Sequence, residues 1–200
     1  MQLASDEEVR TLSFSVPRTL GEHYYADARD FASRFDRLWE MELHKSGRIK
    51  TFVDLLMGCE CALKSHIFLG RENEDTKSVY RAVRKMGHDI GKLADYANYL
   101  SERSLYERVK DQLGTLSVFL RYSLDAYETF WPSALNVKEA RCNHSRTIGS
   151  HRWVMNVRSM LEELLAAVNS EYSGIVDSDL ARLIEHERAM CEFVNECMRP

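Results

Sequence analysis

Glycine and proline are scarce in this sequence, with nine glycines and three prolines in 200 residues. These residues supply most tight turns, so a chain with so few of them has few turns and long elements. That argues against a fold of many short strands and favours helices. The hydrophobic fraction of 44% and the charged fraction of 29% are typical of a globular chain rather than a disordered one.

A long hydrophobic run is also missing, since no stretch approaches the roughly 18 apolar residues of a membrane-spanning helix. The first ten residues, with Asp6, Glu7 and Glu8, do not have the pattern of a signal peptide. The five cysteines are an odd number in a chain long enough to fold without disulfides. We therefore expect a cytoplasmic protein with reduced thiols and no membrane contact.

The charge balance is mildly acidic, with a formal net charge of −4. This argues against a protein that binds nucleic acid over its whole surface. A local basic patch remains compatible with it.

Apolar residues recur at spacings of three and four along most of the chain, which predicts an all-α fold. Short connections between the periodic segments favour an antiparallel helical bundle of about six helices. The third segment is interrupted at Met86-Gly87 and restarts at His88. The expected helices cover approximately residues 17–45, 49–69, 76–100, 104–131, 153–173 and 178–197.

Three parts of the chain are expected on this basis. Residues 1–16 would form an N-terminal arm, and residues 17–132 a helical bundle. Residues 133–200 would form a loop followed by a C-terminal helical hairpin that packs on the same domain.

Glu60 is a polar residue on the apolar face of the segment 49–69. A buried carboxylate costs several kcal/mol unless it is paired, and Lys64 lies four residues later, within reach on a helix. Two interpretations stay open. Glu60 lies at the edge of the apolar face and reaches water, or it is a buried polar hub that links this helix to a neighbour.

The sequence Gly87-His88-Asp89 is suited to the start of a helix, where an acidic residue in the first turn interacts favourably with the helix dipole. A purely structural capping role explains it. A functional role is also open, in which His88 hydrogen-bonds Glu60 or contacts a phosphate.

These two features together resemble a known family. Glu60-Cys-Ala-Leu-Lys64, followed by Gly87-His88-Asp89-Ile-Gly-Lys-Leu93, is similar to the pattern of HEPN (higher eukaryotes and prokaryotes nucleotide-binding) domains. Tyr24-Tyr-Ala-Asp-Ala28 and Arg121-Tyr122 also resemble parts of that pattern, although Ser123 stands where the family often has proline. The resemblance covers approximately residues 20–130.

The resemblance implies an all-α bundle that is often dimeric and that binds RNA or a nucleotide, in some members as a toxin or in phage defence. It makes Glu60, Lys64, His88 and Asp89 candidate binding residues, and we expect a homodimer.

Ribonucleases of the family use an arginine followed, after four to six residues, by a histidine, and both subunits contribute to one cleft. No metal is needed, and no cofactor is expected. Arg146 and His151 have this spacing, as do Arg81 and His88, but chance gives about as many matches. Thr147 after Arg146 fits the family better than Ala82 after Arg81. Arg146 would stabilise the charged transition state and His151 would transfer the proton.

The region around Arg146 is basic, with five basic side chains and one acidic one between Lys138 and Arg158. Arg141 and Arg152 are therefore candidate RNA-binding residues. A solvated loop that pairs with the acidic last helix is the alternative.

Other chemistries are disfavoured. No glutamate lies three residues before any histidine, as di-iron bundles require. The pair Cys59-x-Cys61 does not have the spacing of a zinc site. The rival to RNA or nucleotide binding is a non-catalytic module whose last two helices bind a protein partner.

Overall fold

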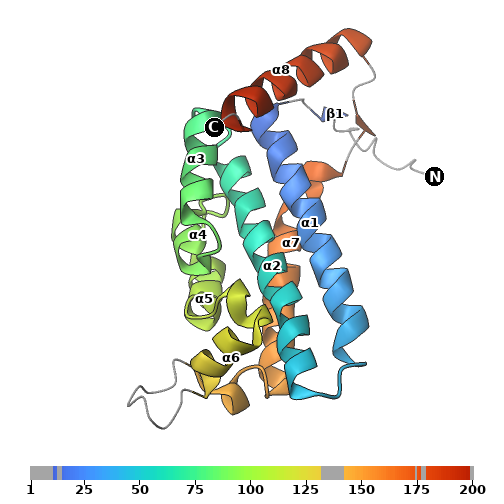
Figure 1. Ribbon diagram of the computed structural model, residues 1–200. Coiled ribbons are helices and arrows are strands. Elements are labelled where there is room, and N and C mark those ends of the chain that lie inside the picture. Colours follow the sequence, from blue (N-terminus) through green and yellow to red (C-terminus); the bar gives the residue numbers. More distant parts are fainter. Residues whose placement is uncertain (1–10, 13–14, 132–141, 174, 177–178, 199–200) are drawn as a thin grey trace, which may run out of the picture.

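The computed structural model describes residues 11–12, 15–131, 142–173, 175–176 and 179–198 (Figure 1). These residues confirm the predicted all-α class. The helices are α1 (Val16–Trp39), α2 (Lys45–Gly70), α3 (Thr76–Met86), α4 (Ile90–Tyr96), α5 (Ser104–Leu113), α6 (Ser123–Phe130), α7 (His151–Tyr172) and α8 (Leu180–Met198). Two 3₁₀ helices, η1 (Val118–Arg121) and η2 (His144–Arg146), and one parallel pair of two-residue strands, β1 (Thr11–Leu12) and β2 (Ile175–Val176), complete the described chain.

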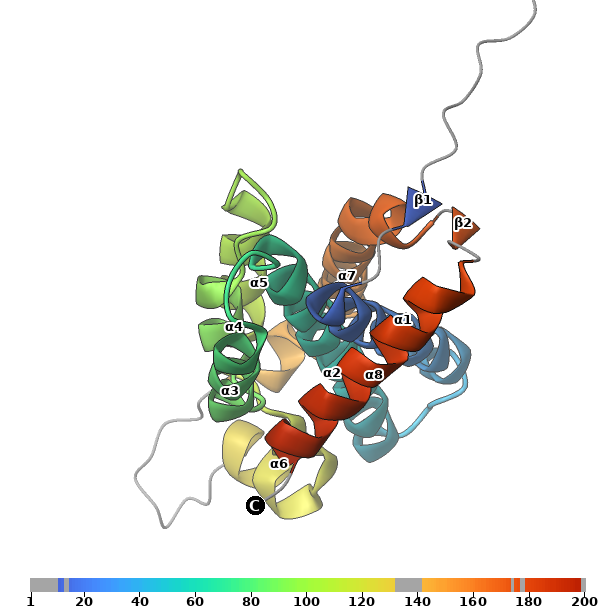
Figure 2. The same ribbon diagram turned by 90° about the horizontal axis from the view of Figure 1, so that it is seen from above.

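Helix α2 is the centre of the bundle, between α1 and α7 on one side and α4 and η1 on the other (Figure 2). It is buried nearly all round, as a helix without a polar face must be. Gly58 permits this close packing, because a Cβ atom there would lie 2.7 Å from Leu161 Cδ2 of α7 and 3.5 Å from the carbonyl oxygen of Ala28 in α1. Helix α1 runs antiparallel to α2 and to α7 (Figure 1).

The last two long helices occupy different places in the fold. Helix α7 contributes its apolar face to the same core as α1 and α2. Helix α8 lies across one end of the bundle, over α1 and α3, where Phe193 packs edge-on against Tyr80 (Figure 1). The described part of the chain therefore does not form a side-by-side C-terminal hairpin. The domain boundaries proposed above stay a prediction.

The helix predicted over residues 104–131 is broken in the structure. Helix α5 ends at Leu113, and Gly114 and Thr115, both poor helix formers, precede η1. Ser117 caps η1 by accepting a hydrogen bond from the backbone N–H of Phe119. The break turns the following residues outward, so that Leu124 is 84% exposed although it belongs to the predicted apolar face.

The first connection also differs from the prediction. Helix α1 ends at Trp39 rather than near residue 45, and Ser46 and Gly47 lie in the first turn of α2. Arg48 Nε donates a hydrogen bond of 2.9 Å to the carbonyl oxygen of Glu42, which supports the short connection. The predicted loop before α7 contains one helical turn, η2, as expected.

His66 of α2 is fully buried in the core and ties three segments together. Its Nε2 lies 2.9 Å from the carbonyl oxygen of Leu164, and its Nδ1 lies 2.7 Å from Tyr106 Oη. Since a carbonyl oxygen only accepts, Nε2 carries the hydrogen and Nδ1 accepts from the tyrosine hydroxyl. Burial lowers the pKa of His66 to about 4.

This lowered pKa predicts a loss of stability in acid. In the unfolded chain an ordinary histidine binds its proton near pH 6.5, so between pH 6.5 and 4 the unfolded state binds more protons than the folded state. The free energy of unfolding should therefore fall by about 3 kcal/mol from pH 7 to pH 4 on account of His66. Urea denaturation at a series of pH values measures it.

The matched control is His66→Gln, which keeps one donor and one acceptor but does not titrate. The variant should show a pH dependence weaker by that amount. Identical pH dependences in the two proteins would contradict the assignment.

Candidate functional site

Glu60 lies in the middle of α2 and is 1% exposed. Lys64, one turn later on the same helix, places its Nζ 2.6 Å from Glu60 Oε1. The ammonium group of Lys64 also lies 5.5 Å from the ring centre of Tyr24 in α1, within the range of a cation–π contact. The carboxylate is thus a buried hub, which is the second of the two interpretations of Glu60.

His88 completes this hub from the connection between α3 and α4. Its Nδ1 lies 2.9 Å from Glu60 Oε2 and 3.1 Å from Oε1. Gly87 turns the chain toward α2 with a φ of +61°, a conformation that favours glycine. The predicted hydrogen bond between His88 and Glu60 is therefore present.

Asp89 does not belong to the hub, although it was a candidate binding residue. Its carboxylate caps α4 by accepting a hydrogen bond of 3.0 Å from the backbone N–H of Lys92. Its other oxygen lies 2.7 Å from Lys92 Nζ. These contacts lower the pKa of Asp89 and explain the residue structurally.

The hydrogen bond to Glu60 determines where His88 carries its proton. A carboxylate only accepts, so Nδ1 of His88 must donate. In the neutral imidazole, Nε2 is then an unprotonated acceptor on the opposite side of the ring. The side chain is 47% exposed, so this acceptor is accessible from outside.

A cavity of about 340 Å³ opens beside His88. The ring of Phe119 from η1 forms one wall, almost perpendicular to the imidazole and 6.4 Å from it between ring centres. The lining residues are His88, Asp89, Gly114, Thr115, Leu116, Ser117 and Phe119.

A second pocket, which we call the basic groove, lies on the other side of η1 and has a volume of about 320 Å³. Its lining is largely apolar, with a cationic side chain at three positions. Lys45 Nζ lies 3.3 Å from the ring centre of Trp131. The lining residues are Lys45, Ser46, Ile49, Lys50, Leu120, Arg121, Ser123, Ala126, Tyr127 and Trp131.

The start of α2 adds to the positive potential of the basic groove. His44 precedes the helix without a side-chain capping hydrogen bond, and the first turn contains no acidic residue. The carboxylate of Glu42 lies against Gly47 in this turn and balances part of the helix dipole.

The predicted catalytic pair is not assembled within the described chain. Arg146 is exposed on η2, and no hydrogen bond or ion pair joins it to His151 in the described ranges. His151 begins α7, where its Nδ1 accepts a hydrogen bond of 3.3 Å from Trp39 Nε1. Arg152 is exposed beside it, and Arg141 lies outside the described residues.

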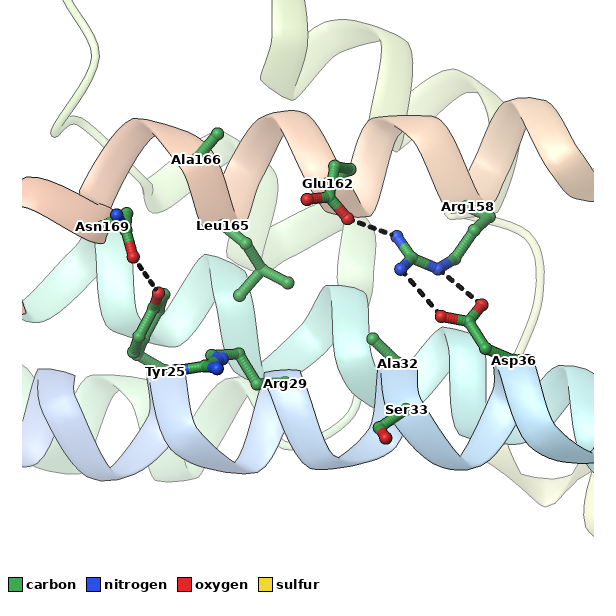
Figure 3. A pocket seen from close by; sticks show the side chains of 10 residues that line it. All are labelled: Tyr25, Arg29, Ala32, Ser33, Asp36, Arg158, Glu162, Leu165, Ala166 and Asn169. Carbon is green, nitrogen blue, oxygen red and sulfur yellow. Dashed lines mark hydrogen bonds and ion pairs between the residues drawn. The ribbon is translucent and has the colours of Figure 1, made fainter.

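Arg158, the last cation of the basic segment, faces acidic partners (Figure 3). It makes a two-point ion pair with Asp36 of α1, with both N···O distances 2.9 Å, and a third contact of 2.8 Å with Glu162. These contacts raise the pKa of Arg158 further. These contacts join α1 to α7 at one end of a groove of about 510 Å³ between the two helices.

No protein-family model, curated protein or solved structure matches this chain. In the described ranges, no three histidine, cysteine, aspartate or glutamate side chains cluster as a metal site would require. None of the described helices is long and apolar enough to cross a membrane.

The hub predicts a specific stability effect. Lys64→Met leaves the Glu60 carboxylate buried with His88 alone and should lower the free energy of unfolding by about 3 kcal/mol. Adding Glu60→Gln removes the buried carboxylate that Lys64 no longer neutralises. The double variant should therefore be more stable than Lys64→Met. Urea denaturation of all four members of the cycle measures the coupling.

Lys92→Met is the control, because its pair with Asp89 is at the surface and should contribute less than about 1 kcal/mol. Equal effects of Glu60→Gln on the free energy of unfolding in the parent and in Lys64→Met would show that Glu60 and Lys64 are not coupled.

Proposed function

We propose that this protein binds RNA or a nucleotide, as its resemblance to HEPN domains implies, and that it does so in the basic groove. The observation that carries the proposal is the chemistry of the groove. A nucleotide combines a flat, largely apolar base with a phosphate, and base stacking on aromatic rings together with cations near the backbone is how proteins bind single strands. Tyr127 supplies an exposed ring, Trp131 lies beneath the ammonium group of Lys45, and Lys45, Lys50 and Arg121 supply the cations.

The hub supports the same proposal. The motifs that resemble the HEPN pattern are far apart in the sequence, yet Glu60, Lys64 and His88 are in direct contact. Arg121, from a third part of that pattern, lies two residues after Phe119, which contacts His88. We further propose that the protein is a cytoplasmic homodimer.

Binding should depend strongly on salt and on the groove cations. Lys45→Ala and Arg121→Ala should each weaken RNA binding and lower the slope of log affinity against log salt by about one. Tyr127→Ala removes a stacking surface from an exposed position and should weaken binding about tenfold. Filter binding with RNA and nucleotides, titrated with salt, measures these effects.

Arg188→Ala is the matched control, because Arg188 is an exposed cation on α8 at the opposite end of the bundle. It should leave both affinity and salt slope unchanged. No binding of RNA or any nucleotide by the parent protein would exclude the proposed function.

A narrower proposal is metal-independent ribonuclease activity by Arg146 and His151, brought together from two subunits. In the neutral form, His151 carries its proton on Nε2 because Nδ1 accepts from Trp39. A neutral Nε2–H donates a hydrogen bond but is too weak an acid to protonate a leaving oxygen, so proton transfer by His151 requires that Nδ1 release Trp39 and the ring take up a proton.

His151→Ala should therefore reduce RNA cleavage about a hundredfold, measured by gel analysis of end-labelled RNA. His23→Ala, an exposed histidine on α1, is the control. Cleavage by His151→Ala at the parent rate would remove the assignment.

The alternative, a non-catalytic module that binds a protein partner, is favoured by one observation. Helix α8 exposes the apolar side chains of Leu180, Ile184 and Val194. Intact RNA binding by the groove variants, with loss of a partner complex on substitution of these three residues, would favour it.

A further inference from the structure

We propose that His88 recognises the 2′-hydroxyl of a ribose, so that the protein prefers RNA to DNA. This inference rests on the proposed function and extends it from the basic groove to the cavity on the other side of η1. The role assigned to His88 is a contact that determines specificity.

The first step is the hydrogen-bonding state of His88. Its Nδ1 donates to Glu60, so Nε2 is an acceptor in the neutral ring. No described residue hydrogen-bonds Nε2. A hydroxyl group of a ligand can donate to this atom.

The second step is that the imidazole is held in place. A side chain that is half exposed would ordinarily change rotamer freely. His88 is instead attached to a carboxylate that is itself buried and held by Lys64 Nζ at 2.6 Å. Specific recognition of one hydroxyl needs this kind of fixed acceptor. If the side chain were mobile, the entropy lost on ordering it would cancel the free energy gained from the hydrogen bond.

The third step concerns the charge of the cavity. Of the described residues that line it, none is lysine or arginine, and the carboxylate of Asp89 is paired with Lys92 at its edge. A phosphate would meet no unpaired lysine or arginine among these lining residues, whereas an uncharged hydroxyl donor is suited to the acceptor of His88. We therefore favour a hydroxyl over a phosphate as the group that His88 contacts.

The fourth step connects the two pockets. Phe119 borders the cavity of His88, and Leu120 and Arg121 border the basic groove, so consecutive residues of η1 separate the two sites. At a rise of about 2 Å per residue, this four-residue helix spans only about 8 Å. A single strand that crosses η1 can place a phosphate near Arg121 and a sugar beside Phe119 and His88.

The 2′-hydroxyl is the group by which a protein distinguishes RNA from DNA at a given position. One hydrogen bond to it should give a preference of about fivefold to tenfold for RNA. Substitution of the acceptor should abolish the preference without affecting what the groove contributes.

The experiment uses single-stranded oligonucleotides of one sequence in three forms, ribose, deoxyribose and 2′-O-methyl ribose, at pH 8, where an ordinary imidazole is neutral. Fluorescence anisotropy gives the three affinities for the parent protein, for His88→Ala and for the control His23→Ala. The parent and the control should prefer ribose over both other forms by the same factor. His88→Ala should bind all three forms with the affinity that the parent has for DNA.

The outcomes separate this inference from the proposed function. Equal affinity of the parent protein for all three forms overturns the role of His88 while leaving RNA binding intact. An equal loss for all three forms in His88→Ala also overturns it, since the residue would then be a general contact. Absence of binding to any form overturns both. If His88→Ala does not fold, His88→Phe takes its place, because it fills the same space without a hydrogen-bond acceptor, and the same outcomes apply.

Discussion

The buried carboxylate of Glu60 is the constraint on which the site depends. A charge in the middle of α2 must be matched there, and Lys64 on the same helix supplies only one partner. The second partner, His88, has to come from another segment, so the turn at Gly87 is held against α2. Because η1 also packs on α2, Phe119 is brought beside the imidazole, and the two pockets share one short helix.

Three histidines of this chain show how their partners determine what an imidazole can do. His88 donates to a carboxylate and offers an acceptor, whereas His151 accepts from an indole N–H and offers a donor. His66 has both nitrogens engaged in the core and offers neither. The sequence shows three histidines but not the hydrogen-bond partners of their ring nitrogens. Their roles can therefore be distinguished only in the structure, from the atoms that each ring contacts.

The fold and the hub could largely be predicted from the sequence because they have local signatures. Apolar periodicity indicates the helices, and Glu60 is conspicuous as the polar residue on an apolar face. The basic groove could not be predicted, since Lys45 and Arg121 are distant in the sequence and meet only in the packed bundle. Arg158 was counted in the basic segment because its neighbours in the sequence are basic. Its partner Asp36 belongs to another helix, so the sequence did not show that its charge is neutralised.

The proposed ligand surface separates affinity from specificity. The protein is acidic overall, so attraction for a polyanion must come from the local field of the basic groove rather than from net charge. Contacts to phosphate position a strand but carry little information about its identity. The cavity beside His88 has the opposite character, with an imidazole held in place by Glu60 and no lysine or arginine among its described lining residues. If one strand occupies both, the groove determines how tightly it binds, and the hub that holds His88 determines which sugar it has.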